Sequence, residues 1–163
     1  IYYYREHGDG SAQGLMHWDL GGYLPPDVEI VAAFDIDRRK VGRDVGEALF
    51  KPPNCTKIFH RDVPNTGTIV QKGKLLDGIP AHMDGLDPNF CYVPSDEPET
   101  TPEQVVATLR QSGAEILVNF LPVGALEATE FYVDCALDAV LEVVICIPVF
   151  IASNPDWAQS FIA

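Results

Sequence analysis

Two carboxylates follow an apolar run near the start of the chain, where residues 30–40 read IVAAFDIDRRK. Asp35 and Asp37 are predicted to lie at the carboxyl end of a buried strand, the end at which open α/β sheets bind their ligands. A carboxylate at this place can accept hydrogen bonds from both hydroxyls of a nucleotide ribose, each contributing about 1.5–3 kcal/mol. The same charge repels a ribose 2′-phosphate, so the pattern favours NAD over NADP.

A second interpretation of the two carboxylates is structural. Asp35 and Asp37 also precede a predicted helix over residues 38–50, and a helix N-terminus favours negative charge by about 0.3–1 kcal/mol. The glycine-rich turn G-x-G-x-x-G, which precedes such an acid by about 20 residues in dinucleotide-binding folds, does not occur in the chain. Ribose binding and helix capping both stay open on this pattern, and we expect an interior piece of a nucleotide-dependent enzyme.

A second candidate group lies where two later strands are predicted to end. In the string NFLPVG, Asn119 could hydrogen-bond a cofactor while Leu121, Pro122 and Val123 pack against its nicotinamide ring or ribose. Pro148 lies in the string IPVFIAS after the next strand, and the carboxyl ends of parallel strands share one edge of the sheet, so the two loops should converge. The alternative is an ordinary strand-to-helix turn in which proline fixes φ and glycine opens the helix.

The elements that position these residues alternate between strand and helix. Nearly continuous apolar runs predict buried strands at residues 29–35, 114–121 and 140–150. Helical spacing of apolar residues predicts helices at residues 38–50, 101–112 and 126–139, and another from Asn154 onward. The string TPEQ from Thr101 is typical of a capping box. We predict an α/β fold with a Rossmann-like, mostly parallel sheet and flanking helices, incomplete at the N-terminal strand.

Two stretches do not follow this alternation. Residues 1–28 are predicted to be a loop-rich lead-in and residues 54–100 a long irregular insertion, of the kind that forms lids, assembly arms or disordered segments. His82 and Asp84 lie in the insertion, but their spacing matches no known ligand pattern, so no metal is expected. Residues 1–163 are predicted to form one partial NAD(P)-binding domain.

Composition excludes several classes of partner. Eleven basic and 24 acidic residues give a net charge of −13, which repels phosphate backbones and anionic lipid, so neither nucleic acid nor a membrane is expected as a partner. No apolar stretch reaches the roughly 20 residues that a bilayer span needs. The four cysteines form no C-x-x-C pair, which favours reduced thiols in a cytoplasmic protein.

Four strings spread along the chain resemble one enzyme family. They are GLMHWDLGGYLPPDVEIVAAFDIDRRKVG, PPNCT, SGAEILVNFLPVGALEAT and CIPVFIAS, and in this order they are similar to myo-inositol-1-phosphate synthase, also called inositol-3-phosphate synthase, of the bacterial and archaeal type. The resemblance implies a parent enzyme that converts D-glucose 6-phosphate to 1L-myo-inositol 1-phosphate with tightly held NAD. The implied steps are oxidation, enolisation, intramolecular aldol closure and reduction, in inositol and phospholipid biosynthesis.

The resemblance also implies roles for particular residues. Asp35 would hold the adenosine ribose, residues 119–123 would line the nicotinamide side, and residues 148–153 would lead towards the catalytic domain. The glycine-rich turn is expected before Ile1, and the catalytic lysines and the tetramer-forming sheet after Ala163, so the chain alone should be inactive and its parent a homotetramer. Where the family carries an asparagine, this chain has Ile145, which would remove a polar contact near the cofactor. An NAD-dependent sugar-phosphate oxidoreductase of related fold and a non-catalytic nucleotide-binding module are the alternatives.

Overall fold

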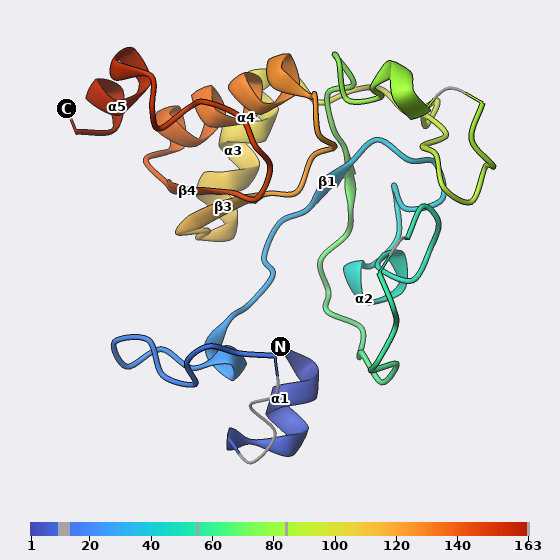
Figure 1. Cartoon of the computed structure of the whole chain (residues 1–163), viewed down its shortest axis with the longest axis vertical. Helices are drawn as coiled ribbons and strands as arrows, with labels where there is room; N and C mark the ends of the chain where they lie inside the picture. Colours follow the sequence, from blue (N-terminus) through green and yellow to red (C-terminus); the bar gives the residue numbers. More distant parts are fainter. Residues whose placement is uncertain (10–13, 55, 84, 163) are drawn as a thin grey trace.

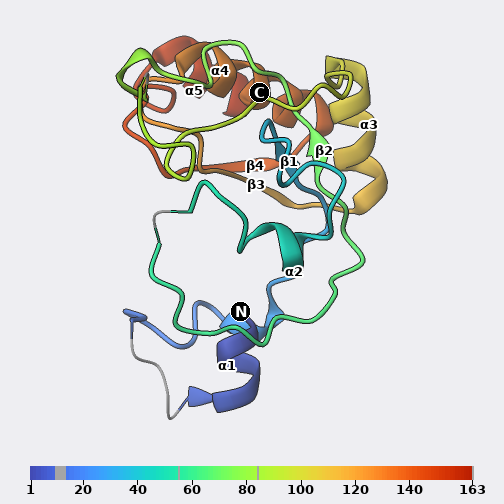
Figure 2. The same cartoon turned by 90° about the vertical axis from the view of Figure 1, so that its right-hand side faces the viewer.

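The computed structural model describes residues 1–9, 14–54, 56–83 and 85–162. The elements in chain order are α1 (Tyr2–His7), the 3-10 helix η2 (Pro25–Asp27), β1 (Phe34–Asp35), α2 (Val45–Ala48), β2 (Gln71–Lys72), the 3-10 helix η3 (Ala81–Met83), α3 (Pro102–Ser112), β3 (Ile116–Asn119), α4 (Leu126–Ala139), β4 (Glu142–Ile145) and α5 (Pro155–Ile162). Figure 1 shows α3, α4 and α5 gathered at one end of the molecule, and β1 rising towards them from the N-terminal part. In the perpendicular view of Figure 2, α1 lies at the opposite end.

Two parallel strand pairs form the β-structure. In the first pair, Phe34 of β1 lies opposite Gln71 of β2. In the second, β3 and β4 pair along four positions, from Ile116 opposite Glu142 to Asn119 opposite Ile145. The pairs are separate two-stranded sheets. The predicted α/β class and the parallel pairing of its strands are confirmed.

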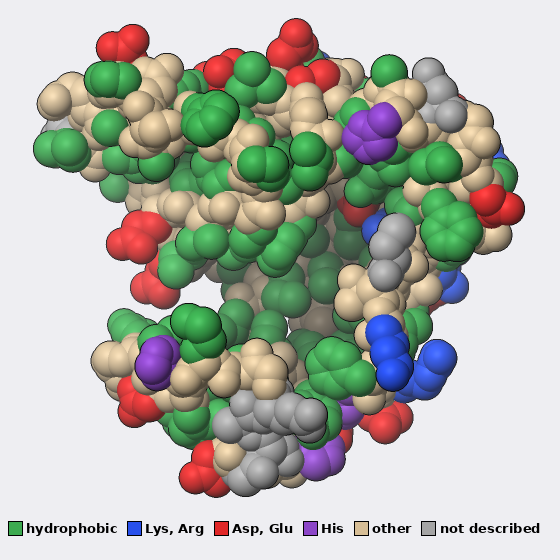
Figure 3. All heavy atoms as spheres, in the orientation of Figure 1, with side chains coloured by type: hydrophobic (Ala, Val, Ile, Leu, Met, Phe, Trp, Pro, Cys, Tyr) green, Lys and Arg blue, Asp and Glu red, His purple; other side chains and the backbone are tan. Residues whose placement is uncertain are grey.

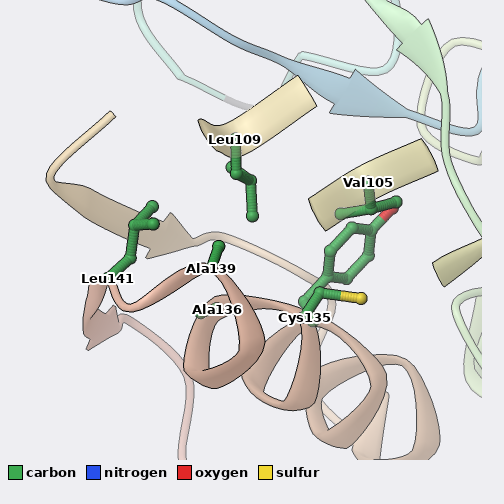
Figure 4. Packing of buried hydrophobic residues seen from close by; sticks show 7 residues of the cluster. Val105, Leu109, Cys135, Ala136, Ala139 and Leu141 are labelled. Atoms are coloured by element: carbon green, nitrogen blue, oxygen red, sulfur yellow. The ribbon is translucent and has the colours of Figure 1, made fainter. Parts of the chain in front are cut away.

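One apolar cluster holds the helices against both strand pairs. Its buried members come from α3, from α4 and from the residue just before β4: Val105, Leu109, Tyr132, Cys135, Ala136, Ala139 and Leu141. Figure 4 shows these side chains meeting between the two helices and the strand beside them. Phe34 of β1 and Leu117 of β3 both pack against this cluster. The two small sheets therefore lie under the same pair of helices.

Local signals account for the two long helices. Thr101 and Gln104 form the predicted capping box at the start of α3, and Gly113 ends the helix with φ 70°, a left-handed conformation that glycine adopts without steric cost. The helix α4 has the predicted bounds, Leu126–Ala139. Helix α5 begins where predicted, with the Asn154 side chain accepting a hydrogen bond from the Asp156 amide at 3.0 Å.

Two predicted elements are much shorter than expected. The strand predicted over residues 29–35 is limited to Phe34–Asp35, because β2 is its sole strand partner among the described residues and consists of two residues. The helix predicted over residues 38–50 is limited to Val45–Ala48. Gly42 has φ 79°, which a helix does not allow, and the Asp44 side chain caps a new start by accepting from the Gly46 amide. The strands predicted over residues 114–121 and 140–150 are likewise limited to β3 and β4.

Apolar side chains remain uncovered on one face of the second sheet. Leu117 and Val143 face the helices, whereas their neighbours Ile116, Val118 and Val144 are 50%, 47% and 46% exposed. The space-filling view in Figure 3 shows hydrophobic side chains lining the hollow between the helical layer and the N-terminal part. Within the described parts of the chain, no helix is both long enough and apolar enough to span a bilayer.

Candidate functional site

Asp35 ends β1 with a carboxylate that is partly exposed. Its carbonyl accepts from the Gly73 amide at 2.9 Å, which fixes the backbone against the turn after β2. In the side chain, Oδ1 accepts from the Asp37 amide at 2.8 Å, and Oδ2 lies 3.5 Å from Nζ of Lys40. The side chain is 24% exposed. One carboxylate oxygen is thus oriented by the backbone, while the other has a single, long contact among the residues that the structure describes.

Asp37 has the opposite environment. It is fully buried, and its Oδ1 accepts from the backbone amide and from Nε of Arg39, both at 2.8 Å. Its Oδ2 accepts from Nη2 of Arg39 at 2.6 Å and from the Val93 amide at 2.8 Å. Burial alone would raise the pKa of Asp37, but the hydrogen bonds from Arg39 and Val93 outweigh it and hold the pKa below its usual value. Both oxygens are therefore engaged inside the protein.

Neither Asp35 nor Asp37 caps a helix among the described residues. The helix after β1 begins at Val45, and its cap is Asp44. Asp37 instead accepts from the amide two residues on, within a turn. The helix-capping interpretation of Asp35 and Asp37 therefore lacks a helix start at the position it requires.

Asn119 is built into the turn that follows β3. Its side chain is 5% exposed. The amide group donates to the Thr129 hydroxyl at 3.1 Å, and the side-chain oxygen accepts from the Leu121 amide at 2.8 Å. These bonds join the end of β3 to α4 and hold the following turn in place. Beyond this clamp, Leu121 and Pro122 are half-buried, whereas Val123 is 58% exposed.

The loops after β3 and β4 begin side by side, as expected for parallel strands. Asn119 lies opposite Ile145, and the Cys146 amide donates to the Asn119 carbonyl at 3.0 Å. Pro148 is exposed in the second loop, and Ile151 anchors that loop with 3% exposure. Both predicted loops therefore leave the sheet at a common edge.

Helix α4 contacts both the carboxyl end of β1, near Asp35, and the carboxyl end of β3, at Asn119. Thr129 binds the Asn119 side chain, while the ring of Tyr132 lies 5.8 Å from that of Phe34, the residue before Asp35. The Tyr132 hydroxyl also accepts from the Lys74 amide at 3.3 Å, and burial raises its pKa. Thr129 and Tyr132 are three residues apart, so they lie on one face of the helix. The carboxyl ends of β1 and β3 are thus held along a single turn of α4.

Three further residues hold the backbone around this region in place, and they were not identified as site residues from the sequence. Arg39 holds Asp37, as described above. The Asp77 carboxylate accepts from the Glu127 and Ala128 amides, both at 2.8 Å, and so caps α4. The Lys72 side chain is 6% exposed, and its ammonium donates to the Ser95 carbonyl at 2.9 Å. The Asp77 and Lys72 contacts involve the stretch predicted to be an irregular insertion, as does the bond from the Val93 amide to Asp37, so this stretch is tied to the domain at several points.

An open groove on the surface does not coincide with the predicted site residues. An open groove of about 510 Å³ lies along α3 and β2, lined by Gln71, Pro98, Glu99, Thr100, Thr101, Gln104, Ala107, Thr108 and Gln111. Among the residues that the structure describes, no group of three His, Cys, Asp or Glu side chains could hold a metal ion. Asp84, considered above with His82, lies outside the described residues, as does Cys55.

Comparisons with known proteins bear directly on the resemblance. No family model matches the chain. It is 43% identical to inositol-3-phosphate synthase of Mycolicibacterium smegmatis over 163 residues, which are 99% of this chain and 42% of that protein. It is 42% identical to the Mycobacterium tuberculosis protein of the same name over 161 residues, 98% of this chain and 41% of that protein. The corresponding Corynebacterium glutamicum protein is 42% identical over 160 residues. The chain therefore spans about 42% of the length of the curated relatives it matches.

A solved structure supports the fold. The crystal structure of a protein called Ari2 superposes with a TM-score of 0.77 at 27% sequence identity, covering 98% of this chain and 43% of Ari2. The Rossmann-like fold class is confirmed by this likeness together with the parallel strand pairs. The resemblance inferred from the four strings is confirmed as well, because the relatives that match nearly the whole chain carry the name of that family.

Proposed function

We propose that this chain, which corresponds to one segment of inositol-3-phosphate synthases, is most of the NAD-binding domain of such an enzyme. The observation that carries the proposal is the 43% identity over 99% of the chain. The proposed reaction of the parent enzyme converts D-glucose 6-phosphate to 1L-myo-inositol 1-phosphate by oxidation, intramolecular aldol cyclisation and reduction. The parent is proposed to act in the cytoplasm as a homotetramer.

The residues at the two strand ends fit the demands of NAD. Asp35 is the proposed ribose ligand, because within the described part of the chain its Oδ2 has one contact, at 3.5 Å, and its side chain is 24% exposed. Asp37 is proposed to contribute indirectly, since its own oxygens bind Arg39 and Val93 while its amide orients Asp35. NAD, when bound, would supply the hydride acceptor and donor of the reaction.

The nicotinamide side is proposed to be lined by Leu121, Pro122 and Val123, with Pro148 opposite on the neighbouring loop. Asn119 is proposed to keep this wall in place through its bonds to Thr129 and Leu121 rather than as a free ligand. Apolar groups at such a place exclude water from the reacting carbon atoms, which strengthens electrostatic interactions nearby. The chain is thus proposed to bind and orient the cofactor, while acid–base groups come from the rest of the enzyme.

Residues 1–163 are proposed to be a partial domain whose sheet continues between β1 and β3. The Glu115 carbonyl accepts from the Glu142 amide of β4, and the Asn119 carbonyl accepts from the Cys146 amide just after β4. Successive residues of a strand alternate in the direction of their backbone groups. The backbone groups of Ile116 and Val118 therefore point away from β4. One additional parallel strand at this edge would join the two pairs under the common helical layer.

The proposal is tested on the longer enzyme that contains this chain. We expect the purified enzyme to form inositol phosphate from glucose 6-phosphate with catalytic amounts of NAD. Asp35→Asn should weaken NAD binding by about tenfold, which corresponds to about 1.4 kcal/mol, because a carboxylate acceptor is lost. Asp62→Asn, an exposed acid in residues 54–100, should bind NAD as the unmodified enzyme does. Failure of the unmodified enzyme to form inositol phosphate would contradict the proposal.

A related oxidoreductase is the second candidate function, and Ile145 is the observation that favours it. This apolar residue lies opposite Asn119 at the edge shared by the two loops, where the family resemblance implies an asparagine. Loss of that polar group could shift the preference to another sugar phosphate. Turnover measured over a panel of hexose and pentose phosphates, before and after Ile145→Asn, distinguishes the two candidates.

A further inference from the structure

Residues 88–95, called the strap below, are held across the carboxyl end of β1. The Arg38 amide donates to the Val93 carbonyl at 2.9 Å, and the Ser95 amide donates to the Ile36 carbonyl at 2.8 Å. Asp37 and Pro94 form an antiparallel bridge between these two bonds. The strap therefore lies directly beside the residues that follow Asp35.

Arg39 is the side chain that fastens the strap. Its Nη1 donates to the Pro88 carbonyl at 2.6 Å, and its Nη2 donates to the Cys91 carbonyl at 2.8 Å. The same guanidinium donates hydrogen bonds to both carboxylate oxygens of the buried Asp37, which also accepts from the Val93 amide. A planar fork with several donors can satisfy two carbonyls and a carboxylate together, which a lysine ammonium cannot do in this geometry.

The network reaches the proposed ribose ligand through the backbone. Arg39 and Val93 fix the Asp37 side chain, and the Asp37 amide donates to Oδ1 of Asp35 at 2.8 Å. On its other side the strap is held by the buried Lys72, whose ammonium donates to the Ser95 carbonyl. Displacement of the strap would therefore disturb the turn that orients Asp35.

We propose that Arg39 is a positioning residue of the nucleotide site, which locks the strap onto Asp37 and thereby holds Asp35 in the orientation that binds the ribose. The proposal rests on the proposed function, because it assumes that Asp35 binds NAD. Arg39 itself does not touch the nucleotide. Its effect is on the affinity for NAD, and it leaves the affinity for the sugar phosphate largely unchanged.

The test uses the full-length enzyme with Arg39→Lys and, as a matched control, Arg61→Lys, which changes an exposed arginine. We expect Arg39→Lys to raise the Kd for NAD about tenfold, equivalent to about 1.4 kcal/mol, with less than a twofold change in KM for glucose 6-phosphate. The control should leave both constants unchanged. A change in stability alone would leave the Kd of the folded enzyme at its original value.

The alkylation rate of Cys91 gives a second measurement, which can be made first on the unmodified enzyme. Cys91 is half-buried in the strap, and coupling between sites is reciprocal, so bound NAD should slow its alkylation in the unmodified enzyme. Peptide mass spectrometry distinguishes Cys91 from the buried Cys135, which serves as the slow reference. In Arg39→Lys the alkylation of Cys91 should accelerate and its protection by NAD should weaken.

The outcomes separate the two proposals. If the unmodified enzyme does not bind NAD, the proposed function fails, and the positioning role of Arg39 fails with it. If the unmodified enzyme binds NAD and Asp35→Asn weakens binding, but Arg39→Lys binds NAD within twofold of the unmodified enzyme, the role of Arg39 alone is overturned. Equal alkylation rates of Cys91 with and without saturating NAD would overturn it as well.

Discussion

Asp35 and Asp37 are two residues apart and have opposite environments. Both follow the same apolar run, so their types and spacing make them equal candidates for a ribose ligand. In the structure, Asp35 keeps a partly exposed oxygen, whereas Asp37 is buried and bound by Arg39 and Val93. Positions two apart share a face of an extended chain, so strand alternation does not separate them. The difference arises because Arg39 and the Val93 amide of the strap bind Asp37 and leave Asp35 partly exposed.

Replacement of Asp37 should destabilise the protein in a pH-dependent way. Asp37→Asn removes a buried carboxylate from Arg39 and should lower the free energy of unfolding by about 2 kcal/mol near neutral pH. Because the pKa of Asp37 is lowered in the folded chain, this stabilisation is fully present above the ordinary value of 3.8. It is lost as the pH falls through the lower value of the folded state. Urea unfolding at a series of pH values measures the difference.

The comparison with Asp62→Asn makes this prediction specific. Asp62 is exposed, so its replacement should change stability little at any pH. The explanation for Asp37 is wrong if the stability difference between Asp37→Asn and the unmodified chain persists undiminished in acid, where both carry a neutral side chain at this position.

Elements made of local contacts were predictable from the sequence, and those that need distant partners were not. The capping box and glycine stop of α3 are encoded within residues 101–113, and the predicted helix there is confirmed. The helix predicted over residues 38–50 is wrong over its first half, because Asp37 draws Arg39 into a turn and Gly42 has a positive φ. The apolar spacing in this stretch gave no sign of either constraint.

The start of α4 has a cap that the neighbouring sequence does not supply. Its N-cap residue, Ala125, has no side chain able to accept a hydrogen bond. Asp77, which lies about fifty residues earlier, accepts from the Glu127 and Ala128 amides instead. Asp77 and Gly78 are typical turn residues, whereas the role of Asp77 at α4 depends on how the stretch before α3 folds back.

Asp77→Ala should therefore loosen α4 although the substitution lies outside the helix. We expect it to lower the free energy of unfolding by about 1 kcal/mol, as for the loss of an ordinary N-cap. Asp87→Ala is the matched control, because the Asp87 side chain accepts from the nearby Asn89 amide in an exposed turn and caps no helix among the described residues. Thermal unfolding followed by circular dichroism measures both changes. Equal destabilisation by the two substitutions would argue against a cap supplied by Asp77.

At the scale of the whole molecule, the two strand pairs are parts of one layer. Phe34, Leu117 and Val143 all pack against the cluster formed by α3 and α4, yet no ladder joins β1 to β3 in the described residues. The sequence predicted a sheet incomplete at its N-terminal strand, because strand-like runs were present without the glycine-rich turn. It did not predict where the additional strand that we propose would lie, since that position follows from the register of β3 with β4.

Hydrogen exchange should reveal the open edge between the two pairs. In this 163-residue chain the amides of Ile116 and Val118 point away from β4, so they should exchange rapidly. In the longer enzyme that contains this chain, an added parallel strand would accept hydrogen bonds from these amides and slow their exchange. Opening of a protected strand amide requires at least local unfolding, so the slowing should be large, on the order of a hundredfold or more.

The amides of Glu142 and Cys146 are the internal reference for this measurement. They donate to the Glu115 and Asn119 carbonyls across the β3–β4 pair, so they should be protected in both proteins. Rapid exchange at Ile116 and Val118 in the longer enzyme would mean that the edge of β3 is not occupied by a strand. The partial sheet would then be the complete one, and the two strand pairs would be held together by α3 and α4 alone.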